Sequence, residues 1–332
     1  MDIGKLPPEL VSKYIYSRMG SYDPAVLIGP SLGEDAAIIR VGNRYLAMHV
    51  DPISGSLELL GWLAVHVVSN DIAVRGLRPR WLMPTIMLPP SVDESVIDVI
   101  TEQMDHAARE VGASIVGGHT EVTTAVSRPV VVMAAVGEGD RYVATGGARP
   151  GDLVLMTKSA ALEAAAILAT DFKDMVLAAG VPREVVERAQ TFAKYVSVVR
   201  EALAISDLAT AMHDPTEGGV VAGLAEVAYA SSVTIIVRAS SIKIAPETAA
   251  LCSAAGLDPL YTLSSGALIA TVPAERVDEA LERLRRIGVE ANVIGEVVPR
   301  GSYLLDGDIK VASPYVRDKL FELFIRQSAG RS

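Results

Sequence analysis

The pattern of hydrophobic positions in the first half of the chain predicts a compact set of strands and helices. Apolar residues alternate between Asp35 and Val50 and are interrupted at Gly42-Asn43, which predicts two strands joined by a tight turn. The apolar stretches that follow predict a helix over residues 56–76, a strand over 81–88, a helix over 93–111, a short strand over 114–116 and a strand over 129–137. The order ββαβαββ predicts an α+β half with a mostly antiparallel sheet, whose faces and edges must be covered.

A boundary between two domains is predicted at GGARPGD, residues 146–152, where a Gly/Pro-rich stretch follows the completed sheet. We therefore expect domains at residues 1–147 and 148–332. The second domain is predicted as α/β, with strands near 153–157, 233–238, 266–272 and 292–298, helices at 160–169 and 275–287, a long helical stretch to about residue 207, a helix to residue 229 and a last helix in PYVRDKLFELFIRQ.

The segment SNDIAVRG places an aspartate on the apolar face of the predicted helix 56–76. Four residues recur at helical spacing and mark one buried face: Leu60, Leu63, Val67 and Val74. Asp71 falls on the same face. Because an ionised carboxylate taken out of water costs several kcal/mol unless a cation or strong donors meet it, the sequence predicts a positive partner for Asp71. That partner is either a metal ion or a neighbouring arginine such as Arg75.

Four aspartates stand at the ends of predicted elements, next to Gly, Pro, Asn or Thr. They are Asp35 in GEDAAI, Asp51 in HVDP, Asp71 in SNDIAVRG and Asp214 in HDPTEGG. Magnesium prefers oxygen ligands from a few carboxylates together with substrate phosphates, so aspartates from separate elements pointing into one crevice fit such a site. The structural alternative is that Asp35 begins a strand and that Asp51 and Asp214 are turn residues before prolines.

Two further segments offer groups for a phosphate-bearing ligand. GGHTEV, residues 117–122, presents His119, Thr120 and Glu121 after two glycines that permit close approach of a backbone; its alternative is a plain hairpin turn. LMTKSAALEAAAIL predicts a strand, a polar loop and a helix N-terminus, with Lys158 close by. The second segment lacks the glycines and the GK[ST] ending of a P-loop.

Composition and charge exclude several classes of protein. The 332 residues carry a formal charge of −10, with a pI of about 5.1 and no basic run, which argues against a nucleic-acid-binding surface. No apolar run approaches the ~18 residues of a membrane span and the N-terminus has no hydrophobic signal core, so we expect a cytoplasmic protein. The single cysteine, Cys252, excludes an intrachain disulfide framework and is predicted to be a buried small hydrophobe. His49, His66 and His106 are isolated in the sequence and indicate no site.

Taken in order, the motifs GEDAAI, VDP, SNDIAVRGLRPRW, GGHTEVT, HDPTEGGV and LSSGALIA resemble those of the aminoimidazole ribonucleotide synthetase (PurM-like) superfamily, over nearly the whole chain. The resemblance is closest to the HypE-like hydrogenase expression/formation branch. It implies a PurM-like two-domain fold, a homodimer whose N-terminal sheets form a barrel across the two subunits, and ATP with Mg²⁺ in a cleft. By position, Asp35, Asp51, Asp71 and Asp214 match the magnesium and phosphate ligands, and residues 119–121 match a loop lining the cleft.

The resemblance leaves the reaction open. HypE itself ends in a cysteine that takes part in its chemistry, whereas this chain ends in QSAGRS, so that chemistry is not carried over. The leading hypothesis is an enzyme that uses ATP to phosphorylate and so activate an oxygen of an unidentified small molecule or maturation substrate. The alternatives are a nucleotide-binding scaffold without turnover, which presents its surface to a maturation-factor partner, and a phosphotransferase similar to thiamine-monophosphate kinase or selenophosphate synthetase.

Overall fold

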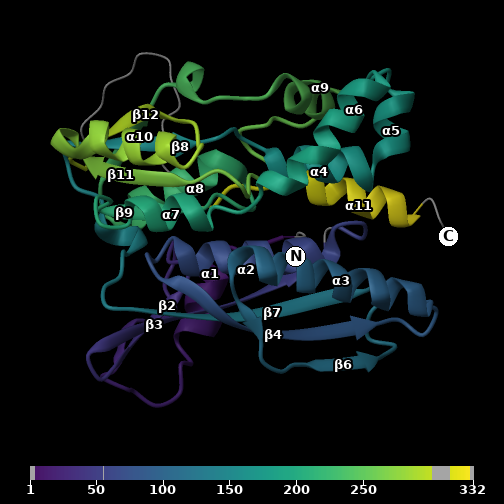
Figure 1. Cartoon of the computed structure of the whole chain (residues 1–332), viewed down its shortest axis with the longest axis horizontal. Coiled ribbons are helices and arrows are strands. Elements are labelled where there is room, and N and C mark those ends of the chain that lie inside the picture. The colour runs from purple at the N-terminus through teal and green to yellow at the C-terminus, as the bar shows by residue number, and fades with distance from the viewer. Residues whose placement is uncertain (1–3, 55, 301–314, 330–332) are drawn as a thin grey trace.

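The computed structural model describes residues 4–54, 56–300 and 315–329, and it contains two sheets with helices packed between and around them (Figure 1). The first sheet consists of seven strands: β1 (Val26–Ile28), β2 (Ala37–Val41), β3 (Arg44–Ile53), β4 (Arg78–Leu88), β5 (Ser114–Ile115), β6 (His119–Val122) and β7 (Val130–Gly139). The second consists of five: β8 (Asp152–Thr157), β9 (Ala211–His213), β10 (Thr234–Val237), β11 (Ile269–Pro273) and β12 (Ala291–Val298).

The helices of the described residues lie mainly in the second half of the chain. In chain order the α-helices are α1 (Pro8–Val11), α2 (Leu60–Ala73), α3 (Glu94–Val111), α4 (Leu162–Thr170), α5 (Lys173–Ala178), α6 (Arg183–Gln190), α7 (Val199–Ile205), α8 (Gly219–Ala230), α9 (Pro246–Ala255), α10 (Val277–Arg286) and α11 (Leu320–Ala329). None of the helices in the described part is both long and apolar enough to cross a membrane.

The first sheet confirms the predicted α+β order and extends it. Its strand order is β1-β2-β3-β7-β4-β5, with β6 also paired to β4, and only the β4–β5 and β4–β6 pairings are parallel. The short strands β1 and β6 were not predicted. Because β6 includes residues 119–122, GGHTEV is the entry to a strand at the edge of the sheet and not a plain hairpin turn.

The predicted end of a strand at Asp51 is wrong, since β3 runs on through Pro52 to Ile53. Beyond Met48 the strand has left β2 behind and pairs only with β7, where Pro52 stands opposite Val132. Proline is tolerated on a strand with one open side, because its missing N–H need not break a ladder hydrogen bond there. Asp51 therefore projects from a continuous strand and is not a turn residue.

The second sheet has the order β10-β12-β8-β11-β9, and all its pairings are antiparallel. Three local predictions for this half need correction. The long helical stretch before residue 207 is broken into α5, α6, a 3₁₀ turn at Thr191–Tyr195 and α7. The segment before HDPTEGG is the edge strand β9, and α9 was not predicted.

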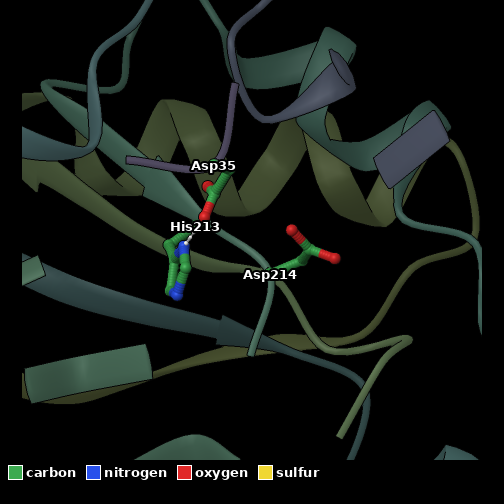
Figure 2. A group of neighbouring side chains, drawn as sticks. All are labelled: Asp35, His213 and Asp214. Atoms are coloured by element: carbon green, nitrogen blue, oxygen red, sulfur yellow. Dashed lines mark ion pairs between the residues drawn. The ribbon is translucent and has the colours of Figure 1, made fainter. Parts of the chain in front are cut away.

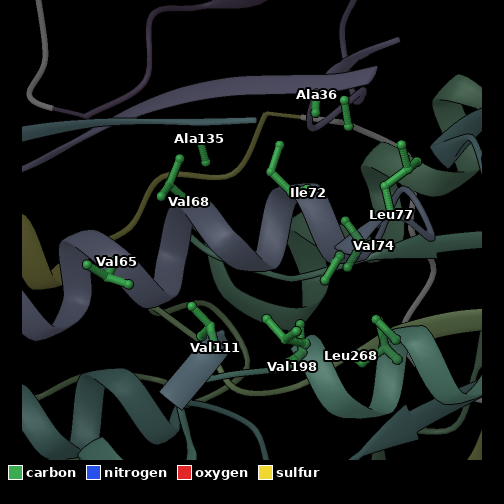
Figure 3. Packing of buried hydrophobic residues seen from close by; sticks show 14 of the residues in the cluster. Ala36, Val65, Val68, Ile72, Val74, Leu77, Val111, Ala135, Val198 and Leu268 are labelled. Atoms are coloured by element: carbon green, nitrogen blue, oxygen red, sulfur yellow. The ribbon is translucent and has the colours of Figure 1, made fainter. Parts of the chain in front are cut away.

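Helix α2 is buried on all sides and not on one face as predicted. Thirteen of its fourteen residues are buried, because it lies between the first sheet and the second half of the molecule (Figure 1). Leu60 and Val74 belong to one hydrophobic cluster, and Leu63 and Val67 belong to another. Figure 3 shows the first cluster, in which residues from the two halves of the chain, such as Val74 and Leu268, pack together.

Asn70 explains the polar interruption in this helix. Its side-chain amide donates to the carbonyl of Val196 (2.8 Å) and its carbonyl accepts from the N–H of Val198 (2.8 Å). Both partners lie in the loop before α7, more than 120 residues away along the chain. A fully buried amide side chain with partners at both ends holds the two halves in a fixed relation.

The outer face of the first sheet carries exposed apolar side chains. Met48 and Val50 on β3 and Met83 on β4 are 42%, 54% and 51% exposed, respectively. The inner face carries buried residues such as Ala47, Leu82 and Ile86, which pack in the core with α2 and α3. Among the described residues, therefore, only the inner face of the central strands is covered.

Candidate active site

Arg75 follows α2 and holds the segment that enters β2. Its side chain is fully buried. One guanidinium nitrogen donates to Glu34 Oε2 (2.6 Å), and the other donates to Asp35 Oδ2 (3.0 Å) and to the carbonyl of Met212 (2.7 Å). Arg75 therefore fixes the Glu34-Asp35 pair, and the alternative hypothesis that it neutralises Asp71 is wrong.

His213, at the end of β9, connects Asp35 to a second acidic group. Its Nδ1 lies 2.5 Å from Asp35 Oδ1, and its Nε2 lies 2.8 Å from Glu226 Oε2. Glu226 also forms an ion pair with Lys5 (3.2 Å). Burial alone would lower the pKa of His213, but Asp35 and Glu226 raise it well above its ordinary value. Burial would raise the pKa of Glu226, but Lys5 and His213 lower it to about 2.

Asp214 is the next residue, yet it shares none of these partners. It is 1% exposed, and neither carboxylate oxygen has a hydrogen-bond partner among the described residues. Figure 2 shows its carboxylate turned away from the ring of His213, to which Asp35 points. Burial raises the pKa of Asp214 well above its ordinary value, and the nearby Asp71 and Asp35 raise it further.

Asp71 meets the inner face of β3. His49 and Asp51 lie two residues apart on that strand and so share a face. His49 Nε2 is 3.2 Å from Asp51 Oδ1 and 3.6 Å from Asp71 Oδ2. In the described part of the chain, Asp71 Oδ2 is buried without a hydrogen-bond partner. Burial raises the pKa of Asp71 well above its ordinary value, and the carboxylates of Asp51 and Asp35 act in the same direction.

The glycine pair of HDPTEGG permits the tight turn between Asp214 and α8. Gly218 and Gly219 have φ of +81° and +68°, a region that L side chains rarely adopt. A Cβ at Gly219 would also lie 2.6 Å from the carbonyl oxygen of Leu260. The turn lets α8 begin immediately after the loop, so that Glu226 from its middle reaches His213.

The arrangement fits a hard divalent cation. Ligand atoms of Asp35, His213 and Asp214 lie within 4.8 Å of one another, and so do those of His49, Asp51 and Asp71. Both ring nitrogens of His213 lie against carboxylates. The atoms still available to coordinate a metal ion are therefore carboxylate oxygens, above all those of Asp71 and Asp214. Oxygen donors of this kind suit magnesium better than they suit softer metals.

The structure brings together the four predicted aspartates, but not the other predicted site residues. His119, Thr120 and Glu121 are exposed on β6, which is separated from β3 by β7 and β4. Three strand spacings correspond to about 14 Å. His119 lies 3.4 Å from Glu121, and within one described chain neither contacts an aspartate of the cluster.

Lys158 likewise lies outside the cluster. Its Nζ forms an ion pair with Glu201 (2.6 Å) and donates to the carbonyls of Ser197 (2.6 Å) and Tyr195 (3.0 Å). It lines a cavity with Arg78 that is separate from the one beside Asp51. Its ammonium group is therefore used within the protein, and the structure does not bring it to the predicted phosphate site.

Sequence reasoning missed the residues that support the aspartates. His49 was interpreted as isolated, and no role was predicted for Lys5, His213 or Glu226. The one available signal was His213, which directly precedes Asp214 in a motif already singled out. Cys252 is buried, as predicted, and burial raises the pKa of its thiol to about 12, so it offers no thiolate at neutral pH.

The sequence that forms these two sheets matches the family of AIR synthase related proteins. The N-terminal domain of that family matches residues 33–138 and its C-terminal domain matches residues 149–306, so the chain belongs to this family. Within it the chain is HypE-like. It is 30% identical to carbamoyl dehydratase HypE of Cupriavidus necator, over 79% of this chain and 74% of that protein.

Solved structures of hydrogenase maturation proteins share the fold. A crystal structure of the hydrogenase maturation protein HypE is 26% identical to this chain, with a TM-score of 0.68, and the match covers 86% of this chain and 94% of that one. A second HypE structure, in complex with ATP, is 24% identical with a TM-score of 0.68, and covers 94% and 96%. The likeness to the second structure concerns the fold alone.

Proposed function

We propose that this protein is an ATP-dependent enzyme that transfers a phosphoryl group to an oxygen atom of a small molecule, with Mg²⁺ and the nucleotide phosphates held by Asp35, Asp51, Asp71 and Asp214. One observation carries the proposal: three buried carboxylate oxygens, Oδ2 of Asp71 and both oxygens of Asp214, accept no hydrogen bond in the described part of the protein, and the only cationic partner among them is His49, 3.6 Å from Asp71 Oδ2. Buried charges are retained where something pairs with them. The ATP complex of a HypE relative with the same fold supports a nucleotide as that partner.

The remaining residues position the aspartates. Arg75 holds one oxygen of Asp35 and His213 approaches the other, so this carboxylate has a fixed orientation. His49 does the same for Asp51. When bound, Mg²⁺ would neutralise charge on the nucleotide phosphates during transfer. Phosphoryl transfer asks the protein chiefly for positioning and charge neutralisation, and this arrangement is built for both.

Asp214→Asn tests the proposal through ATP hydrolysis measured with Mg²⁺ and a pool of small metabolites. We expect the hydrolysis rate of the variant to fall at least about tenfold, because the substitution replaces one carboxylate oxygen with an amide nitrogen and removes the negative charge. Asp105→Asn, an exposed change on α3, is the control and should leave the rate unchanged. Equal hydrolysis in wild type and Asp214→Asn would contradict the proposal. Tight binding of Mg²⁺-ATP with no hydrolysis in any metabolite pool would favour the nucleotide-binding scaffold.

We further propose that two copies pair through the outer face of the first sheet. The exposed Met48, Val50 and Met83 form an apolar face of the kind that monomeric proteins avoid, and the family resemblance implies a dimer there. We expect a dimer in light scattering at micromolar concentration and a monomer for Val50→Lys. Val293→Lys, on β12 of the second sheet, is the control and should remain dimeric. A monomeric wild type would overturn this part of the proposal.

A further inference from the structure

A cavity of about 580 Å³ opens directly beside the aspartate cluster. Asp51, Lys5 and Arg128 are among its charged lining residues, and helices α2, α4 and α11 contribute to its walls together with loop segments. The apolar part of the lining includes Leu63, Val67, Ile167, Leu263 and Phe321. A volume of this size suits a small organic molecule, and its contact with Asp51 places any occupant next to the proposed phosphates.

Glu163 is the unexplained polar group in this wall. It lies in the first turn of α4, is 4% exposed, and its Oε2 has no hydrogen-bond partner among the residues the structure describes. No ion pair joins it to a described lysine or arginine. Ser265 lies on the same wall, also without a hydrogen bond of regular geometry to its hydroxyl. Burial raises the pKa of Glu163 to about 7, against a smaller opposing effect of Ser265.

Glu201 is a second buried glutamate, and it has an ion-pair partner within the protein. It is a helical glutamate with nearly the same exposure, 3%, on α7. The chain gives it the ammonium group of Lys158 at 2.6 Å. Glu163 has the same burial and no such partner, yet an open cavity lies in front of it. A cation supplied by a ligand would complete the pair that the chain leaves incomplete.

We propose that this cavity binds the acceptor substrate, and that Glu163 receives a protonated amino group carried on an apolar frame. The inference rests on the proposed function and specifies its substrate class. The apolar walls accommodate the frame, with the amino group at Glu163. Because Asp51 lines the same cavity, the rest of the molecule has access to the proposed phosphates. A free carboxylate oxygen would repel the phosphates of a nucleotide, so the Glu163 end of the cavity does not suit them.

Three four-carbon probes test the inference: n-butylamine, n-butanol and butyrate, titrated by calorimetry at pH 7 with and without Mg²⁺ and a non-hydrolysable ATP analogue. We expect the wild-type protein to prefer butylamine to butyrate. In Glu163→Gln, butylamine should bind about tenfold or more weakly, because the charge-assisted hydrogen bond is lost. Glu163→Asp keeps the charge and should retain part of the preference. Glu279→Gln, exposed on α10, is the control and should bind as wild type.

Several outcomes would overturn the inference. One is equal binding of butylamine to wild type and Glu163→Gln, and another is equal binding of butyrate and butylamine to wild type. A third is that Glu163→Gln weakens binding of the ATP analogue but not of tripolyphosphate, which would put the nucleotide base in the cavity. Failure of the wild type to bind the ATP analogue with Mg²⁺ would instead count against the proposed function. The titration of butylamine without nucleotide would still test whether the cavity binds an amine.

Discussion

The acidic side chains around the site fall into two groups that differ in their partners. At the entry to β2, Glu34 meets the fully buried Arg75 at 2.6 Å and also accepts from the backbone N–H groups of Thr145 and Gly146 (3.1 Å each). Asp71 and Asp214 are buried more deeply, but Oδ2 of Asp71 and both oxygens of Asp214 accept no hydrogen bond in the described chain. The first group stabilises the protein as it is; the second is costly until something binds.

Removal of Arg75 gives the largest expected effect. Arg75→Ala removes the cation of Glu34 and leaves Asp35 with His213 alone, and breaking a buried pair in this way costs ~3 to 5 kcal/mol in the free energy of unfolding. Urea denaturation measures the loss. The control is Arg109→Ala, whose pair with Asp105 is exposed on both sides and should contribute little. If both variants lost similarly little free energy of unfolding, Arg75 would not stabilise its acidic partners as proposed.

Glu163 is a further buried acid without an ion-pair partner in the described chain, and its state can be detected through pH. The pKa of Glu163 is about 7 in the folded protein and about 4.5 when unfolded. A group whose pKa is higher in the folded state stabilises the folded protein at pH below its unfolded pKa. This stabilisation is lost as the pH rises through the folded pKa. The free energy of unfolding of the wild type, relative to Glu163→Gln, should therefore fall by about 3 kcal/mol between pH 4.5 and pH 7. Parallel pH profiles of the two proteins would show that Glu163 has a partner.

Asp71→Asn has the smallest effect on the empty protein and the most informative sign. Removing an unneutralised charge should leave the free energy of unfolding unchanged or raise it by on the order of 1 kcal/mol. The stabilisation by Mg²⁺ and an ATP analogue should shrink, by about 1.4 kcal/mol for each tenfold loss in affinity. Melting curves with and without the ligand decide this. A large destabilisation that does not depend on the ligand would show that Asp71, like Glu34, has a partner within the protein.

The sequence predicts the aspartates better than it predicts their supports. Each aspartate stands out locally, either at the end of a predicted element or on an apolar helix face, so four of the site residues could be named. Their partners depend on tertiary contacts: Lys5 and Glu226 are 221 residues apart, and Arg75 reaches Met212 across 137. From the local sequence, Arg75 is a charged residue just beyond the end of a helix, and the adjacent residues do not indicate that its side chain is fully buried.

The same limit applies to the fold. Periodicity predicts the elements of the first sheet, because each strand and helix there has its own local pattern. It does not predict that α2 is buried on all sides, since its second covering comes from residues near 196–198 and beyond. The edge strands β6 and β9 were missed for a related reason: each is four residues or fewer and gains its strand geometry from one neighbour.

The shared core around α2 also matters while the protein is being made. The helix and its first sheet are complete by Gly139, but the residues that cover its other side extend from Val198 to Leu284. At a synthesis rate of about 5–20 residues per second, the ribosome needs on the order of 10 to 30 s to supply them. During that interval the part of α2 that these residues cover is open to solvent on the nascent chain. We therefore expect a fragment that ends after the first sheet to be prone to aggregation.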